Sequence, residues 1–289
     1  MRLRVIYNPA GGRGRVARRM DEVREHLRAL GATAELYATT SADDLARAAA
    51  EASRDESVDR VVICGGDGSV HHGVRDFDLE HGTFAILPLG SGDDFADVCN
   101  VPRDVRRACE IAVRGEVREV DVALANGIRY LGVAGLGFDS EVNEHANSIR
   151  IPLGSFVYVY ATLRLLPRFQ PHRLSIDGAP PSPIMFAAVG NSRQYGGGIR
   201  IAPDAKLDDG LLDACIVHRT SRWQLLMTMP RAYKGAHVQS DFVEIRRART
   251  FFFKSEDTLK VYGDGELMTT TPVTFGLEEK RLRVVVGDE

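Results

Sequence analysis

The first 120 residues alternate short apolar runs with amphipathic segments, and this alternation constrains the fold more than any other feature of the chain. Strands are predicted at Leu3–Tyr7, Val58–Cys64 and Thr83–Leu87. The helix expected after the first strand has apolar residues spaced by four, three, four and three positions: Val16, Met20, Val23, Leu27 and Leu30. Strands that alternate with helices predict a parallel sheet with helical crossover connections.

Two further helices complete the predicted first domain. Ser41, followed three residues later by Asp44, resembles a capping box that opens a helix through Ala52. Val105–Val113 is predicted to be a helix closed by Gly115. We therefore predict an α/β domain over residues 1–120.

After residue 120 the pattern changes to strand-like runs separated by turns. The predicted strands are His172–Ile176, Ile184–Val189, Leu211–Val217, Thr250–Lys254, Leu259–Tyr262 and Leu282–Val286. Helical stretches are expected near Ile151–Pro167 and Ser221–Ala236. Because this pattern is typical of an antiparallel β-sandwich, residues 121–277 are predicted to form a second domain of a different class.

Composition narrows the class of protein further. The 289 residues are 44% hydrophobic and 27% charged, as in globular proteins, and the net charge of −3 gives no global reason to bind nucleic acid. Four cysteines are scattered without metal-ligand spacing, which favours reduced thiols in a cytoplasm. Since the chain also lacks a signal-peptide pattern and any apolar run of roughly 18–20 residues, we expect a cytoplasmic protein.

A glycine-rich loop, Gly65-Gly66-Asp67-Gly68-Ser69, follows the strand predicted at Val58–Cys64. Ligands of open α/β sheets bind beyond the carboxyl ends of strands, so this loop stands where a site is expected. Glycines let backbone N–H groups approach phosphate oxygens closely, and Asp67 could hold Mg²⁺ or a ribose hydroxyl. Taken alone, the loop is also compatible with a tight turn and a capping serine.

Two more loops of this kind follow neighbouring strands. Pro88–Ala96 (PLGSGDDFA) follows the strand predicted at Thr83–Leu87, and Asn8-Pro9-Ala10-Gly11-Gly12 follows the first strand. In a parallel sheet the three loops share one edge and face a common ligand. The chain contains no Gly-x-x-x-x-Gly-Lys-[Ser/Thr], which excludes a P-loop, and no Gly-x-Gly-x-x-Gly that opens a helix, which leaves a Rossmann-type dinucleotide site unsupported.

The order of the motifs resembles that of the bacterial diacylglycerol kinase family of soluble lipid kinases. The resemblance rests on Asn8-Pro9, Gly65–Ser69, Pro88–Ala96, Ala205–Asp213 (AKLDDGLLD) and Asp264-Gly265-Glu266. Each motif is weak alone, whereas five in order are specific. The resemblance implies a nucleotide-binding α/β domain, a β-sandwich domain and an active site in the cleft between them, with segment 278–289 completing the first domain.

The resemblance also implies roles for individual residues. It assigns ATP binding to Asn8, Pro9, Ala10, Gly11, Gly12, Thr39, Gly65, Gly66, Asp67, Gly68, Ser69, Val70, His71, His72, Ser91 and Asp94. It assigns Mg²⁺ to the backbone carbonyls of Lys206 and Leu211 and to the Asp209 carboxylate. It makes Glu266 the proton acceptor, and it joins Asp67, Asp94 and Asp121 in an acidic, metal-linked network around the phosphates.

The chemistry of these residue types agrees with phosphoryl transfer. That reaction depends mainly on positioning and charge neutralisation, which glycine-rich loops and carboxylate-bound Mg²⁺ supply. A lipid hydroxyl benefits from a carboxylate such as Glu266 that takes its proton during attack. A surface hairpin turn is the structural alternative for the Asp264-Gly265-Glu266 motif.

Several positions depart from the family pattern. Ser69 and Ser91 replace threonines but keep a hydroxyl. Asp93 replaces an asparagine, and its charge should weaken ATP binding unless the side chain points away or meets a cation. His71-His72 replaces an amide or acid followed by glutamate, and Gly132 stands where asparagine is common.

The expected function is ATP-dependent transfer of the γ-phosphoryl group to a lipid hydroxyl, converting diacylglycerol to phosphatidic acid. The alternatives are a kinase of a sphingoid base or of phosphatidylglycerol, an NAD-kinase-like nucleotide kinase, and a non-catalytic ATP-binding regulator. The motifs at Pro88–Ala96 and Ala205–Asp213 argue against the nucleotide kinase.

The expected partner is a lipid substrate at a membrane surface, with peripheral contact at its inner face and no nucleic acid. The stretch Ile149–Arg168 is apolar and flanked by arginines, so it suits either an interfacial helix or a helix that covers the sandwich. The sequence is also compatible with a homodimer.

Overall fold

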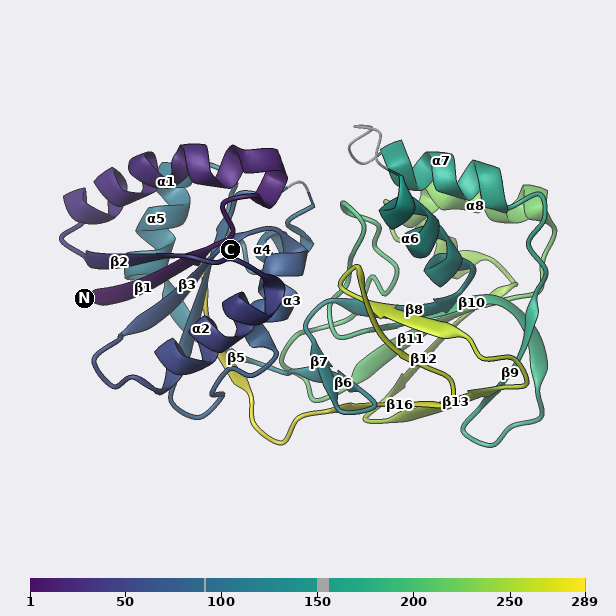
Figure 1. The fold of residues 1–289 in the computed structure, drawn as a ribbon. Coiled ribbons are helices and arrows are strands. Elements are labelled where there is room, and N and C mark those ends of the chain that lie inside the picture. Colours follow the sequence, from purple (N-terminus) through teal and green to yellow (C-terminus); the bar gives the residue numbers. More distant parts are fainter. Residues whose placement is uncertain (91, 150–155, 289) are drawn as a thin grey trace. The chain divides into compact units, whose positions relative to one another are not determined.

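A computed structural model describes residues 1–90, 92–149 and 156–288. The chain divides into two compact units, which are treated separately below. Unit 1 consists of Met1–Val122 with Glu279–Glu289, and unit 2 consists of Ala123–Glu278 (Figure 1). No helix among the described residues is long and apolar enough to cross a bilayer.

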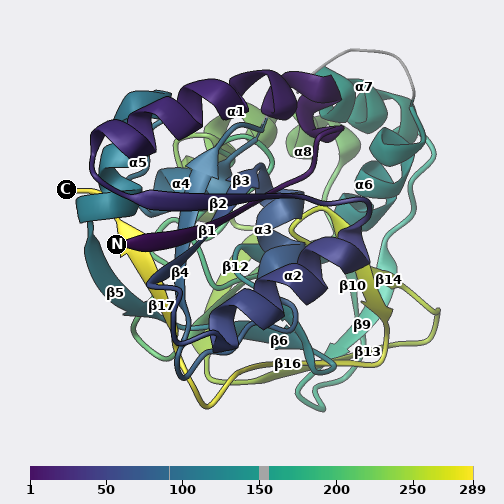
Figure 2. The ribbon, with the colours of Figure 1, turned by 60° about the vertical axis from the view of Figure 1, so that its left-hand side comes forward.

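Unit 1 contains a six-stranded sheet with helices on both faces (Figures 1 and 2). In spatial order its strands are β2 (Thr33–Ala38), β1 (Arg2–Tyr7), β3 (Arg60–Gly65), β4 (Thr83–Pro88), β17 (Leu282–Val286) and β5 (Glu116–Val120). Its helices are α1 (Gly11–Ala29), α2 (Ala42–Arg54), α3 (Asp67–Val74), α4 (Asp94–Val98) and α5 (Val105–Arg114). Helix α1 packs against α5, and α2 packs against α3.

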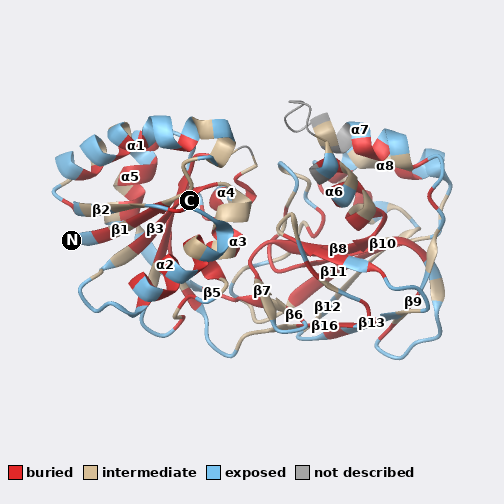
Figure 3. Ribbon diagram, viewed as in Figure 1, coloured by how far each residue is buried: buried red, intermediate tan, exposed pale blue. Residues whose placement is uncertain are grey.

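The local sequence explains these elements. Strands β3 and β4 are almost wholly buried, because helices cover both faces of the sheet, and they therefore read as continuous apolar runs (Figure 3). Ser41 caps α2 by accepting a hydrogen bond from the Asp44 N–H at 3.0 Å, at the predicted helix start. The predicted apolar face of α1 is buried at Val16, Met20, Val23 and Leu27.

The end of the chain returns to the first sheet. Strand β17 runs parallel to β4 and antiparallel to β5, and it buries Leu282, Val284 and Val285. The pattern of strand-like runs predicts Leu282–Val286 as a strand of the second domain. The structure places this strand in the sheet of unit 1 instead. An apolar strand run does not reveal which sheet it joins.

Unit 2 contains an eleven-stranded sheet in which all strand pairs are antiparallel. Its strands are β6 (Ala123–Ala125), β7 (Ile128–Tyr130), β8 (Val133–Gly137), β9 (His172–Ile176), β10 (Ser182–Gly190), β11 (Leu212–His218), β12 (Val243–Ala248), β13 (Phe251–Ser255), β14 (Lys260–Gly263), β15 (Glu266–Thr270) and β16 (Val273–Leu277). Its helices are α6 (Phe138–Ser148), α7 (Phe156–Leu165), α8 (Arg222–Ala232) and the 3₁₀ helix η1 (Ala236–Gln239). The α/β unit followed by a sandwich-like unit confirms the predicted fold class.

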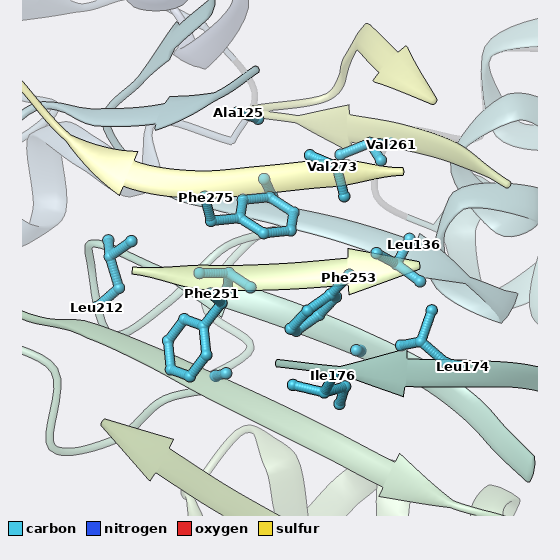
Figure 4. Packing of buried hydrophobic residues seen from close by; sticks show 14 of the residues in the cluster. Ala125, Leu136, Leu174, Ile176, Leu212, Phe251, Phe253, Val261, Val273 and Phe275 are labelled. Atoms are coloured by element: carbon cyan, nitrogen blue, oxygen red, sulfur yellow. The ribbon is translucent and has the colours of Figure 1, made fainter. Parts of the chain in front are cut away.

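Two apolar cores stabilise unit 2. The first lies among the strands and contains Phe251, Phe253 and Phe275, whose rings meet edge to face (Figure 4). Phe252 points outward, as expected where side chains alternate along a strand. The second core lies between the sheet and helices α6, α7 and α8. The predicted helix Ile151–Pro167 is observed as α7, while residues 150–155 lie outside the described residues.

Candidate active site

The loops that follow β3 and β4 pack directly against each other. The Asp67 carboxylate accepts a hydrogen bond from the Phe95 N–H at 3.1 Å, and the Leu89 N–H donates to the Gly65 carbonyl at 3.0 Å. Each loop thus supplies a partner for a backbone group of the other. The structure brings together the two loops that the sequence places after successive parallel strands.

Glycine is required where the loops meet. A Cβ atom at Gly90 would lie 2.7 Å from the Gly66 backbone nitrogen, and one at Gly92 would lie 2.7 Å from the Asp67 carboxylate. Such distances are shorter than real Cβ contacts, so a side chain at either position would push the loops apart. The glycines therefore serve close packing of the two loop backbones.

Asp93 organises the second loop. It adopts a left-handed backbone conformation (φ 58°), and its carboxylate accepts a hydrogen bond from the Gly90 N–H at 3.0 Å. The Arg103 guanidinium lies 3.5 Å from this carboxylate and also donates to the Gly92 carbonyl. Burial raises the pKa of Asp93 to about 6, although Arg103 opposes the shift. Asp93 therefore pairs with a cation. Because Arg103 balances its charge, Asp93 is not expected to repel ATP.

An arginine joins the loop after β1 to the loop after β4. The Asn8 side chain accepts a hydrogen bond from the Ala10 N–H at 2.9 Å, which forms a turn at the end of β1. Arg15 donates to the Gly12 carbonyl and to the Gly90 carbonyl, both at 3.2 Å. All three glycine-rich loops consequently lie at one edge of the sheet.

The start of α1 is irregular. Gly12, Arg13 and Gly14 have positive φ angles of 55°, 60° and 80°, so regular right-handed turns begin only after Gly14. The sequence predicts a helix after this loop, and the structure places a left-handed turn in its first residues, because glycines on both sides of Arg13 permit it.

The other residues assigned to ATP binding lie close to this edge. The Thr39 N–H donates to the Tyr7 carbonyl at 2.9 Å, which places Thr39 beside the end of β1. Gly68, Ser69, Val70, His71 and His72 lie within α3, and Val70 and His71 are buried. The two histidine rings meet edge to face with centroids 5.3 Å apart. Ser91 lies outside the described residues.

Asp121 belongs to unit 1 and is buried. Its carboxylate accepts a hydrogen bond from the Arg281 guanidinium at 2.9 Å. Because Arg281 precedes β17, the carboxylate is bound to the chain segment that closes the sheet. The assignment of Asp121 to a metal-linked network remains a prediction.

In unit 2, Glu266 begins β15 directly after a two-residue turn. Asp264 and Gly265 have positive φ angles of 53° and 88°, as a type I′ hairpin requires. The Asp264 carboxylate accepts hydrogen bonds from the Leu131 and Gly132 N–H groups at 3.0 and 2.9 Å. The hairpin that carries Glu266 is therefore fixed to the backbone before β8.

Gly132 fits this anchor for a steric reason. A Cβ atom at position 132 would lie 2.6 Å from an Asp264 carboxylate oxygen. The departure from the family pattern at this position thus makes room for the carboxylate that holds the hairpin.

The residues assigned to Mg²⁺ lie in the turn before β11. The Asp209 carboxylate accepts a hydrogen bond from the Leu211 N–H at 3.1 Å and pairs with Arg247. Arg247 also lies 3.0 Å from the buried carboxylate of Asp213. Among the described residues no cluster of three or more His, Cys, Asp or Glu side chains could hold a metal, so a site here depends on the carbonyls of Lys206 and Leu211.

Sequence reasoning gave no role to the carboxylate of Asp139. Asp139 follows β8, and its carboxylate accepts a hydrogen bond from the Tyr195 hydroxyl at 2.6 Å. Burial raises its pKa to about 6. The sequence offered one indication of a role for Asp139: it directly follows Gly135-Leu136-Gly137-Phe138, where a strand ends in glycines.

Comparison with known proteins agrees with these features. The sequence profile of the diacylglycerol kinase catalytic domain matches residues 2–125, and the profile of the YegS C-terminal NAD kinase beta sandwich-like domain matches residues 132–286. A protein of Mycobacterium tuberculosis (strain ATCC 25618 / H37Rv) named diacylglycerol kinase is 33% identical over 290 residues, which cover 97% of this chain and 93% of the relative.

Two further similarities extend over the whole chain. The protein named diacylglycerol kinase in Bacillus subtilis (strain 168) is 27% identical, and the match covers 100% of this chain and 97% of the relative. A crystal structure of a proposed diacylglycerol kinase from Bacillus anthracis str. Sterne superposes with a TM-score of 0.82 and 25% identity, covering 99% of this chain and 95% of that one.

The fold, the loops and the matches define a phosphotransferase that has an alcohol acceptor. More narrowly, the chain belongs to the diacylglycerol kinase family of lipid kinases. The family implies ATP as the phosphoryl donor.

Proposed function

We propose that the protein transfers the γ-phosphoryl group of ATP to the free hydroxyl of diacylglycerol and releases phosphatidic acid and ADP. One observation carries the proposal: three glycine-rich loops meet at one sheet edge, joined by the Asp67–Phe95 and Arg15–Gly90 hydrogen bonds. The names of the relatives support diacylglycerol as the acceptor.

The loops of unit 1 suit a triphosphate chemically. Their glycines let the two backbones approach closely, since a Cβ atom at Gly90 or Gly92 would clash with Gly66 or with the Asp67 carboxylate. Arg103 balances the buried carboxylate of Asp93. We assign ATP binding to the three loops and Thr39, with Asp67 and Asp94 close to the phosphates.

Mg²⁺ is the metal that the donor set favours. Two carbonyl oxygens and one carboxylate are hard oxygen ligands, and Lys206, Asp209 and Leu211 lie within one turn. Arg247 neutralises the Asp209 carboxylate, so a cation bound there would share that carboxylate with Arg247. A bound Mg²⁺ would supply positive charge and rigidity to this turn.

Glu266 is the proposed general base. In the reaction, the lipid oxygen forms a bond to the γ-phosphorus while the bond to the β-phosphate oxygen breaks. The hydroxyl proton passes to the Glu266 carboxylate as attack proceeds. The Asp264 anchor limits the positions that this carboxylate can adopt.

Replacement of Glu266 tests the assignment. We expect Glu266→Ala to lower turnover by at least a hundredfold, because general base catalysis contributes about 10²–10⁴. ATP binding, measured by calorimetry, should change less than about twofold. Glu256→Ala is the matched control, because Glu256 is an exposed glutamate of the same unit. Full lipid kinase activity in the Glu266 variant would contradict the role.

A substrate panel identifies the acceptor. Diacylglycerol, a sphingoid base, phosphatidylglycerol and NAD are presented with labelled ATP and Mg²⁺, the lipids in mixed micelles. Labelled phosphatidic acid is the expected product. Labelled NADP or a different labelled lipid would show that NAD or that other lipid is the acceptor. ATP binding without any labelled product would indicate a non-catalytic regulator.

A further inference from the structure

Strand pairing in unit 2 sets an arginine against a buried carboxylate. Arg247 lies on β12, directly opposite Asp213 on the antiparallel strand β11, and its guanidinium lies 3.0 Å from one Asp213 oxygen. Opposite charges at facing positions of paired strands attract each other. The Asp213 side chain is 2% exposed and that of Arg247 is 40% exposed. The register of the sheet therefore places a half-exposed cation over a buried anion.

The same guanidinium reaches the turn before β11. It donates a hydrogen bond to one Asp209 carboxylate oxygen, while the other Asp209 oxygen accepts the Leu211 N–H at 3.1 Å. Both oxygens of Asp209 thus accept N–H groups of the protein itself. Through one side chain, Arg247 joins the turn to the strand that follows it.

This turn is rich in negative charge. Asp204, Asp208 and Asp209 precede β11, and Asp204 and Asp209 are close enough to Asp213 to act on it electrostatically. Lys206 is the other cation of the turn, and its side chain is exposed. Because like charges repel at short range, the turn requires a positive charge between Asp209 and Asp213.

Arg247 and a metal ion would use the same carboxylate. The Mg²⁺ assignment gives Asp209 as the carboxylate ligand, and Arg247 already holds one of its oxygens. A metal ion and a guanidinium next to each other also repel. The turn therefore has two alternative sources of positive charge, the arginine of the chain itself and a divalent cation.

We propose that Arg247 is a built-in alternative to Mg²⁺ at this turn. It neutralises Asp209 and Asp213, holds the turn against β11, and competes with the metal for the Asp209 carboxylate. Arg247 is thus a positioning residue that lowers the affinity of the turn for Mg²⁺ and makes its fold independent of the metal. This role rests on the metal assignment in the proposed function.

Calorimetric titration with MgCl₂ alone measures the competition. The full-length protein is treated with EDTA, dialysed and titrated without nucleotide. We expect Arg247→Gln to bind Mg²⁺ at least about tenfold more tightly than the wild-type protein, because a positive charge beside the metal is removed. Arg249→Gln, at an exposed arginine just after the same strand, is the matched control and should change the affinity less than about twofold.

A second substitution locates the binding signal. Carboxylates of unit 1 could also take up Mg²⁺, so Asp209→Asn is added to Arg247→Gln and should abolish the tighter binding. Urea unfolding gives a readout that does not depend on calorimetry. The unfolding midpoint of the wild-type protein should differ little between EDTA and excess MgCl₂, whereas that of Arg247→Gln should fall in EDTA and recover in MgCl₂.

Arg247→Gln leaves Asp213 buried without its cation, so a further variant guards against simple loss of the fold. Arg247→Gln with Asp213→Asn removes both charges of the strand pair and should bind Mg²⁺ several-fold more tightly than Asp213→Asn alone. Equal affinities in both backgrounds, or no Mg²⁺ binding by any variant, would overturn the role of Arg247. A lipid kinase assay judges the proposed function separately, because absence of phosphorylated lipid would refute that function and leave the metal titrations unaffected.

Discussion

At the scale of single residues, Asp93 shows how a charge is accommodated in a tightly packed glycine-rich loop. Its carboxylate is buried, accepts the Gly90 N–H and faces Arg103. An asparagine would keep the hydrogen bond and lose the charge. Aspartate and asparagine at position 93 can therefore make the same hydrogen bond. Only aspartate makes the stability of the protein depend on pH through this side chain.

This difference yields a prediction. The pKa of Asp93 is raised from 3.8 to about 6 in the folded protein, so the folded state binds more protons between these values and stability falls as pH rises through them. The difference corresponds to roughly 3 kcal/mol above pH 6. Asp93→Asn should therefore raise the free energy of unfolding by up to about 3 kcal/mol at pH 8 relative to its effect at pH 4.

Urea unfolding at pH 4 and pH 8 measures this effect. Glu25→Gln, an exposed acid on α1, serves as the control and should show no such difference. Calorimetry should show little change in ATP binding by Asp93→Asn, because Arg103 already balances the charge of the carboxylate. An equal stability change at both pH values would refute the prediction.

At the scale of elements, the β14–β15 hairpin depends on residues outside it. Asp264 fixes the turn through two backbone N–H groups, and Gly132 leaves space for the carboxylate. The position of Glu266 therefore depends on a backbone segment more than 130 residues earlier in the chain.

Gly132→Ala tests this dependence. The added methyl group displaces the Asp264 carboxylate, which loses two hydrogen bonds worth about 1 kcal/mol each. We expect kcat to fall about tenfold while the KM for ATP changes less than about twofold, because the loops proposed to bind ATP belong to unit 1. Gly276→Ala on β16 meets only ordinary contacts and is the control. An unchanged kcat would show that the anchor does not position Glu266.

The strands, helices and loops also show how much of the fold the sequence could predict. Strands β3 and β4 were predicted because burial on both faces leaves a continuous apolar run. Strand β2 and helix α6 were missed, because β2 alternates exposed and half-buried residues and α6 is mostly polar. The three loops were predicted because each follows a predicted strand and contains glycines. The sequence did not predict the roles of three arginines, Arg15, Arg103 and Arg247, because no local pattern indicates which carbonyl or carboxylate a surface arginine contacts.

At the scale of the whole molecule, unit 1 is built from both ends of the chain. Strand β17 fills the space between β4 and β5, and Arg281 before it binds the buried Asp121. The sheet whose edge carries the three glycine-rich loops is therefore incomplete without residues 279–288.

A charge placed in β17 should abolish ATP binding from a distance. Val284 is fully buried, so Val284→Asp is expected to destabilise unit 1 by about 4 kcal/mol or more and to eliminate ATP binding. Val117→Asp on neighbouring β5 is the control, because Val117 is 40% exposed. Limited proteolysis and calorimetry measure the two effects. Retained ATP binding by Val284→Asp would contradict the requirement for β17.

The late position of β17 in the chain also sets an order of events during translation. The ribosome releases β1 to β5 first, then the whole of unit 2, and only then the strand that pairs with β4 and β5. During that interval the nascent polypeptide carries an open sheet edge at β4. A message cut short before codon 282 consequently yields a product whose second unit is complete and whose first unit is not.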